Sequence, residues 1–178
     1  ISFGPTNGDV VIEYNYFHHC MTNSADGGVI HNGRDMIRPV NIIRYNIISE
    51  IPATLQGGTY GIYLDDYEAN NEIYGNIFYG VATAIVTNRG RDNVITDNTL
   101  IYSGSMFINP GANGLLDEWA PGSLYYDQFH SILPKEGSPY YEIWKEKCPH
   151  AYKYDIDPAN TSNKNSIFLV SSTVKDNI

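Results

Sequence analysis

The carboxylates best placed for chemistry in this chain come directly after a short apolar segment. Asp65 and Asp66 are adjacent and follow residues 61–64, so two acids share one turn. Two carboxylates held this close can raise the pKa of one of them, which is one way in which proteins prepare a general acid. The alternative is that the pair only begins a turn and bonds backbone N–H groups, a common role of aspartate.

Charged residues follow the neighbouring apolar segments in the same way. Arg34 and Asp35 come after the preceding segment, and Arg89, Arg91 and Asp92 come after the following one. Arginine side chains can bind hydroxyl groups or the carboxylate of a substrate. A surface ion pair of Asp92 with Arg89 or Arg91 is the simpler alternative.

His18, His19 and His31 are potential metal ligands, but their placement argues against a metal site. Adjacent residues of a strand point to opposite faces, so we expect that His18 and His19 cannot bind one ion together. Cys20 and Cys148 are far apart in the sequence and belong to no CxxC pair. We therefore expect no metal centre, and whether the two cysteines form a disulfide stays open.

The composition indicates a mostly β protein. The chain of 178 residues is rich in Ile and Asn, with 15 Tyr, 16 Gly and only 17% charged residues. Branched and aromatic residues favour strands, whereas Asn and Gly favour turns. No apolar run approaches the ~18 residues of a membrane-spanning helix. The net charge of −9 argues against nucleic acid and anionic membranes as partners.

The elements that position the charged residues are repeated short segments. The pattern apolar-x-x-Asn-x-apolar occurs at residues 12–17, 43–48, 73–78 and 95–100, and its asparagines are 31, 30 and 22 residues apart. A second apolar segment follows each copy, at residues 28–31, 61–64, 83–86 and 105–108. The anchoring residues are Asn15, Asn46, Asn76 and Asn98.

Two short strands per repeat can bury their apolar faces if successive repeats stack and share parallel ladders. Asparagine fits one recurring corner, because it tolerates the left-handed conformation and its amide can bond the asparagine of the next repeat. A β-sandwich with ordinary hairpins is the alternative, and the spacing disfavours it. Aligning the second segments predicts that Asn32, Asp65, Thr87 and Asn109 form one stack at the ends of their strands.

The repeats and three motifs resemble the right-handed parallel β-helix proteins of the pectate-lyase-like superfamily. The motifs are DGGVIHNGRD at residues 26–35, GIYLDDY at 61–67 and RGRDN at 89–93. Residues 139–158 also look like the segment that follows the last full repeats in these proteins. The nearest likeness is to bacterial β-helix-repeat proteins that act on carbohydrates, including glycoside hydrolase family 141. The resemblance implies an all-β parallel solenoid, and we expect the chain to be the C-terminal portion of a longer one.

The resemblance also implies a carbohydrate groove along the charged corner, and most simply a glycoside hydrolase. We expect Asp65, Asp66 and Asp26 to be the catalytic residues, although Asp26 beside two glycines is also a plain turn residue. The alternatives are a polysaccharide lyase, which would use Ca²⁺ held by aspartates, and a non-catalytic glycan-binding or structural protein. The expected substrate-binding residues are His31, Arg34, Arg89, Arg91, Asp92 and Trp119.

The repeat stops after residue 109, which divides the chain into three parts of one domain. Residues 1–109 form the repeats, and residues 110–163 are an aromatic-rich excursion with a short helix at 140–147. Residues 164–178 return to the repeats through a strand near 167–171. The aromatic side chains, including Trp119 and Tyr126, either cover the repeats or stack on sugars.

The resemblance further implies where the protein acts. We expect a monomer that is secreted, periplasmic or at the cell surface, with a polysaccharide or oligosaccharide as its partner and no membrane insertion. No cofactor is expected, apart from Ca²⁺ in the lyase alternative.

Overall fold

The structure is a computed structural model that describes residues 1–3, 8–23, 25–35, 37–53, 58–109, 122, 127, 131–153 and 172–178. Its strands form three sheets in which all neighbouring strands are parallel. The helices α2 (Tyr141–Lys147) and α3 (Pro149–Lys153) follow most of the strands. The prediction of a mostly β fold with parallel sheets is confirmed.

Each sheet takes its strands from successive repeats. Sheet A contains β3 (Gly27–Gly33), β6 (Thr59–Asp65), β9 (Ile85–Asn88) and β12 (Phe107–Asn109). Sheet B contains β1 (Val11–Glu13), β4 (Asn41–Arg44), β7 (Asn71–Tyr74), β10 (Val94–Thr96) and β13 (Thr173–Lys175). Sheet C contains β2 (Tyr16–His18), β5 (Ile47–Ile51), β8 (Ile77–Val81) and β11 (Thr99–Ile101).

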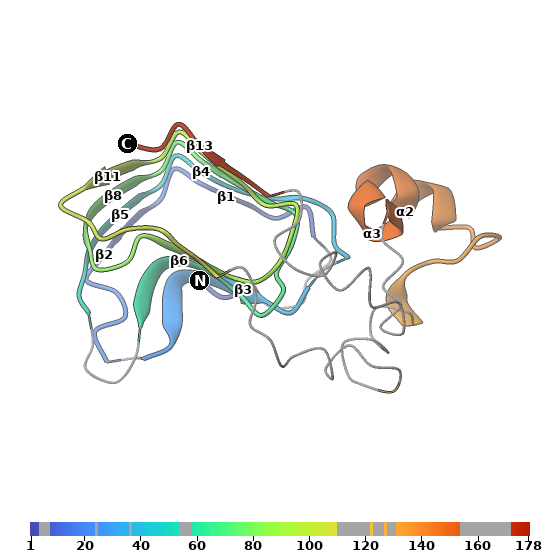
Figure 1. Cartoon of the computed structure of the whole chain (residues 1–178), viewed down its shortest axis with the longest axis horizontal. Coiled ribbons are helices and arrows are strands. Elements are labelled where there is room, and N and C mark those ends of the chain that lie inside the picture. The colour runs from blue at the N-terminus through green and yellow to red at the C-terminus, as the bar shows by residue number, and fades with distance from the viewer. Residues whose placement is uncertain are drawn as a thin grey trace.

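The chain passes through sheets B, C and A in turn, and we call one such passage a circuit. Figure 1 shows the three sheets as sides of one stack, with strands of successive circuits lying over one another. The spacing of the asparagines therefore measures the length of a circuit. Within the described residues this arrangement explains both repeated segments, because the pattern with asparagine spans sheets B and C and the second segment lies in sheet A.

The core consists of columns of branched side chains between the sheets. Ile12, Ile43, Ile73 and Ile95 pair in register along sheet B, and none is more than 6% exposed. Each fully buried isoleucine stabilises the fold by about 1.5–3 kcal/mol relative to an exposed one. Because every circuit supplies one residue to the column, the stacking is held chiefly by apolar burial.

The predicted stack of Asn15, Asn46, Asn76 and Asn98 is confirmed at the corner between sheets B and C. Each side-chain amide donates to the Oδ1 atom of the next asparagine over 2.9–3.0 Å, and Asn98 continues the ladder to Asn177. The expectation that asparagine itself is left-handed is wrong. The residue before it has the positive φ angle, and the asparagine amide satisfies backbone carbonyls of the corner.

A left-handed corner also recurs toward the end of each strand of sheet C, directly after β2 and β11 and inside β5 and β8. The residues at this position in four circuits are His19, Glu50, Gly80 and Tyr102, with φ between 49° and 61°. A left-handed residue turns the chain sharply and changes the direction in which the next side chains point. This corner therefore brings together side chains that a continuous strand would separate.

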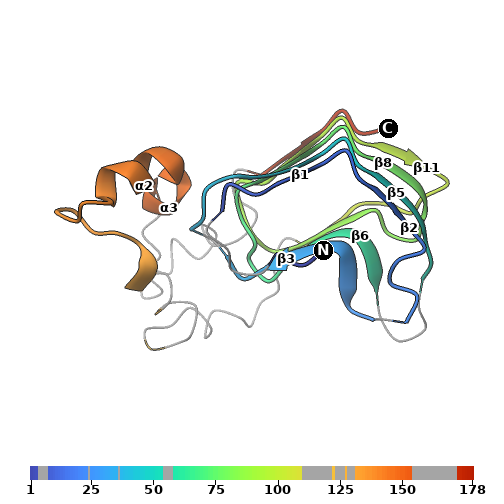
Figure 2. The same ribbon diagram turned by 180° about the vertical axis from the view of Figure 1, so that it is seen from behind.

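The chain returns to sheet B after the helices, since β13 pairs in parallel with β10. The expected helix at 140–147 is confirmed as α2, whereas the expected strand at 167–171 lies outside the described residues, as does most of 110–163. Figures 1 and 2 place both helices beside the end of the molecule where the strands of sheet B begin. There Lys147 Nζ lies 2.6 Å from Asp9 Oδ2. Cys20 and Cys148 are free thiols.

Candidate active site

The alternation of side chains along β6 separates a core face from an outer face of sheet A. Ile62 and Leu64 are fully buried in the core. Tyr63 and Asp65 point the other way, because successive side chains of a strand alternate. His31 of β3 pairs with Tyr63 and joins them on the outer face. The sheet thus brings His31 and Asp65 together from residues that are far apart in the sequence.

The predicted stack of strand-end residues is wrong by one position. Asn32 pairs with Leu64, and Leu64 pairs with Thr87, so these three face the core. Asp65 instead pairs with Gly33. The core-facing residues Ile30, Ile62 and Ile85 pair with one another and set the register. A slip of one residue exchanges the two faces of a strand, which is why Asn32 and Thr87 are buried and Asp65 is not.

Aromatic rings give the outer face a rigid base. The His31 ring stacks on the Tyr63 ring with centroids 4.8 Å apart, and Tyr60 meets Tyr63 edge-on at 4.7 Å. Such pairs are worth about 0.5–1.5 kcal/mol beyond their burial. Tyr63 is only 6% exposed, whereas 30% of the His31 side chain is exposed. His31 is therefore both fixed and accessible.

The Tyr63 hydroxyl contacts two carboxylates on this face. It donates to Asp26 Oδ1 over 3.5 Å, and the Asp65 carboxylate lies near enough to raise its pKa. Burial raises the pKa of Tyr63 most, and the hydrogen bond to Asp65 and the charges of both carboxylates raise it further. The phenol therefore stays protonated, and it donates to Asp26 while lying beside Asp65. We call His31, Asp26, Tyr60, Tyr63 and Asp65 the sheet A face.

The two oxygens of Asp65 have different surroundings. Oδ1 accepts the backbone N–H of Asp66 and the Asn88 amide, each over 2.9 Å. Oδ2 lies 4.0 Å from His31 Nε2, and 20% of the side chain is exposed. The expected turn-forming role of Asp65 is thus confirmed for one oxygen, while the other oxygen lies on the accessible surface beside an imidazole.

Asp66 is surrounded by cationic and amide groups. Its carboxylate lies 3.2 Å from Arg34 Nε and 3.7 Å from Arg89 Nη1, and it accepts from Asn88 over 3.2 Å. Arg34 is the exposed partner, with 62% of its side chain in solvent. Asp66 therefore holds the two arginines beside the sheet A face, and its charge is largely offset by theirs.

Two further expected substrate-binding residues pair with each other. Arg91 Nε lies 2.8 Å from Asp92 Oδ2, which confirms the simpler ion-pair interpretation. Only 2% of the Arg91 side chain is exposed, so it is not presented to a substrate on the surface. Trp119 lies outside the described residues.

The corner between sheets A and B contains two buried acids, Glu68 and Asp35. Glu68 is 1% exposed and accepts from Asn32 over 2.6 Å and from Asn71 over 3.4 Å. Burial and then the charge of Asp35 raise the pKa of Glu68 well above that of an exposed glutamate. Burial also raises the pKa of Asp35, despite its 2.7 Å contact with Arg38. Asp35 belongs to the motif at 26–35, whereas no motif marks Glu68, because the sequence does not reveal which turn residues point inward.

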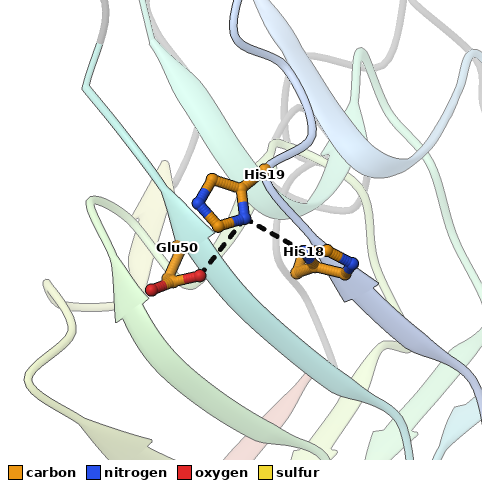
Figure 3. A group of neighbouring side chains, drawn as sticks. All are labelled: His18, His19 and Glu50. Atoms are coloured by element: carbon orange, nitrogen blue, oxygen red, sulfur yellow. Dashed lines mark hydrogen bonds and ion pairs between the residues drawn. The ribbon is translucent and has the colours of Figure 1, made fainter.

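The expectation that His18 and His19 point apart is also wrong. Their Nδ1 atoms are 3.0 Å apart, and His19 Nδ1 is 3.2 Å from Glu50 Oε2 (Figure 3). The strand ends at His18, and His19 adopts a left-handed φ of 51° that turns its ring toward its neighbour. This group could hold a metal ion.

In the part of the chain that the structure describes, no helix has the length and apolar character needed to cross a membrane. Comparisons of the sequence and the structure with protein-family models, curated proteins and solved structures found no match.

Proposed function

We propose that this chain belongs to a carbohydrate-active protein, most simply a glycoside hydrolase, whose substrate lies on the sheet A face. The observation that carries the proposal is the contact of one neutral phenol, Tyr63, with two carboxylates, Asp26 and Asp65. Glycosidases use two carboxyl groups on either side of the scissile bond. The arrangement also agrees with two of the three catalytic residues expected from the sequence.

The order of the strands in the three sheets also supports the proposal. Three parallel sheets that each gain one strand per circuit are the arrangement expected for a parallel β-helix, and we propose that the coil is right-handed, as in the pectate-lyase-like superfamily. Long parallel sheets of this kind present a flat row of side chains along which a polymer can lie. Under this proposal the protein is a secreted or surface-exposed monomer that binds a polysaccharide.

Asp26 and Asp65 both lie beside the Tyr63 hydroxyl on the same face of sheet A. Retaining enzymes hold their two carboxyl groups ~5 Å apart and inverting enzymes hold them ~6.5–9.5 Å apart. The proposal covers both classes. We assign Asp65, beside His31, and the exposed Asp26 as the two catalytic carboxyl groups.

Groups beside the carboxylates would position the sugar. Arg34, which is exposed and held by Asp66, is suited to a sugar hydroxyl or a uronate carboxylate. His31 presents a partly exposed ring edge next to Asp65. Asp66 acts in this scheme as a positioning residue for Arg34 and Arg89, and not as an acid.

Binding without cleavage is the second candidate. It is favoured by Asp65 Oδ1, which is engaged by Asn88 and by the backbone of Asp66, as in a structural aspartate. In this case the same face would bind glycan through His31 and Arg34.

A panel of plant and host polysaccharides tests both candidates. We expect the purified protein to release reducing ends from at least one glycan without forming an unsaturated product, since unsaturation would indicate a lyase. Asp65→Asn and Asp26→Asn should each lower kcat at least about 100-fold while binding persists. Asp92→Asn, which removes an ion pair elsewhere, is the matched control and should keep its activity.

The outcomes separate the candidates. Full activity in both Asp65→Asn and Asp26→Asn would remove these residues from the mechanism. Saturable binding without turnover of any glycan would favour the non-catalytic candidate.

A further inference from the structure

His18, His19 and Glu50 bring three metal-binding atoms together on the surface (Figure 3). The two Nδ1 atoms are 3.0 Å apart, His19 Nδ1 is 3.2 Å from Glu50 Oε2, and all three ligand atoms lie within 4.8 Å of one another. The group lies at the ends of the sheet C strands β2 and β5, so it is separate from the sheet A face. An inference about it does not depend on the proposed function.

The backbone explains why the three side chains converge. His18 pairs with Ser49 across the ladder of β2 and β5, so His19 and Glu50 occupy the same corner in neighbouring circuits. Both have left-handed φ angles, 51° and 55°, and the His19 N–H donates to the Ser49 carbonyl. The corner thus fixes the backbone of the group before any ion binds.

The spacing of the ligand atoms fits a small divalent ion. Two ligands at ~2.1 Å from one ion are ~2.9 Å apart at a right angle and ~3.4 Å apart at the tetrahedral angle. The distances of 3.0 and 3.2 Å fall between these limits. The third distance, between the ligand atoms of His18 and Glu50, shortens when the exposed Glu50 side chain rotates.

The rings are oriented for binding through Nδ1. His18 stacks on Tyr16 with centroids 5.0 Å apart and an interplanar angle of 17°. Its ring meets that of His19 edge-on at 5.3 Å. All three side chains are exposed, so water can complete the coordination.

We propose that His18, His19 and Glu50 bind one divalent transition-metal ion, of which Zn²⁺ is the representative, through both Nδ1 atoms and a carboxylate oxygen. Two imidazoles and one carboxylate suit Zn²⁺ and its neighbours in the first transition row, whereas Ca²⁺ prefers oxygen ligands alone. Because the ligands come from two circuits, the ion links β2 to β5 and stabilises this end of sheet C. Three protein ligands leave at least one position open to water or to an exogenous ligand.

Metal titration of the protein without a histidine tag tests the proposal. We expect Zn²⁺ to bind at one site per chain, to raise the melting temperature, and to be replaceable by Co²⁺ with a visible spectrum of nitrogen and oxygen ligation. Ca²⁺ should produce none of these effects. His18→Ala and Glu50→Gln should each weaken Zn²⁺ binding at least about tenfold.

Two control variants test whether Zn²⁺ binds instead to a thiol or to an imidazole outside this site. His31→Ala and Cys20→Ser should retain the affinity of the wild type for Zn²⁺. Because His18, His19 and Glu50 are exposed, their substitution should leave the circular dichroism spectrum of the metal-free protein unchanged. The proposal is overturned if Zn²⁺ does not bind saturably, if binding survives both His18→Ala and Glu50→Gln, or if Cys20→Ser abolishes it.

Discussion

Asn46 shows how one side chain serves the backbone of several circuits. Its amide donates to the carbonyls of Ile12 and Arg44 and to Asn76 Oδ1, and its own Oδ1 accepts from the backbone and side chain of Asn15. Asn46 is fully buried, so no water can replace these bonds. A buried polar group left without a partner costs about 1–3 kcal/mol.

Asn46→Ala should therefore lower the free energy of unfolding by about 2–4 kcal/mol, because it leaves backbone groups of two circuits without partners. Asn15→Ala is the matched control, since Asn15 is exposed at the end of the described ladder and should cost less than about 1 kcal/mol. Urea denaturation measures both. Equal losses in the two variants would contradict the proposed role of buried hydrogen bonds.

Glu68 should make the stability depend on pH. Its raised pKa means that the folded protein keeps a proton that the unfolded chain releases above the ordinary value of 4.5. The stabilisation is complete below that value and is lost as pH rises toward the folded pKa, by at most about 1.4 kcal/mol per pH unit. The raised pKa of Asp35 acts in the same direction.

Glu68→Gln should consequently gain stability relative to the wild type as the pH is raised from about 5 to about 8, because glutamine has no proton to lose. Glu72→Gln, at a neighbouring glutamate that is only partly buried, is the control for the same chemical change. Urea denaturation at several pH values measures the effect. A difference between Glu68→Gln and wild type that does not change with pH would show that Glu68 is ionised in the folded protein.

At the residue scale, the sequence indicated which residues matter more readily than which way their side chains point. The asparagines were correctly placed because their spacing repeats, and Asp65 was singled out by its adjacent acid. The direction of Asn32, Thr87 and His19 could not be predicted. It depends on a register shift of one residue in sheet A and on a left-handed φ after β2, and neither has a signature in a single sequence.

At the scale of the elements, left-handed residues make the sharp turns that lead the chain from one sheet to the next. Gly80 and Gly90 both have left-handed φ angles, 61° and 85°, but differ in the space around them. A Cβ on Gly80 would meet only the Glu50 nitrogen at 4.0 Å. On Gly90 it would lie 2.0 Å from the Glu68 carbonyl oxygen. The first glycine tests conformational strain alone, and the second adds a backbone clash.

Gly80→Ala should cost about 1 kcal/mol of unfolding free energy, since a non-glycine residue in the left-handed region is strained by roughly that amount. Gly90→Ala should cost more than about 3 kcal/mol, because backbone must move. Thermal or urea denaturation of both variants checks the order. Similar losses in the two variants would show that close packing against the Glu68 carbonyl does not constrain this corner.

The elements themselves were largely predictable, because a short apolar segment repeated at a regular interval can bury its face only against its own copies. The helix α2 was expected from Pro139, which precedes it, although the N-cap residue Tyr140 makes no capping side-chain hydrogen bond. The expected return strand at 167–171 lies outside the described residues, whereas β13 has no sequence signal because it is only three residues long and all three are exposed. It is held by pairing with β10 and by Asn177, which extends the asparagine ladder.

At the scale of the whole molecule, the stack creates two separate surfaces with different chemistry. The sheet A face combines carboxylates with aromatic rings, whereas the corner after sheet C combines two imidazoles with Glu50. Both arise because equivalent positions of successive circuits lie next to each other. Such a stack places residues that are distant in the sequence next to each other without any local motif. Contacts between them are therefore only partly predictable from the sequence.

The claim that glycan lies on the sheet A face is tested most directly by following the histidine ring resonances during titration with an oligosaccharide from the glycan panel. Using Asp26→Asn prevents turnover under the proposed mechanism. His31 stacks on Tyr63 beside Asp65, so its ring signals should shift in a saturable manner, while those of His18 and His19 should stay unchanged. The account is contradicted if a glycan binds but leaves the His31 ring signals unchanged. It is also contradicted if the signals of His18 or His19 shift saturably while those of His31 do not.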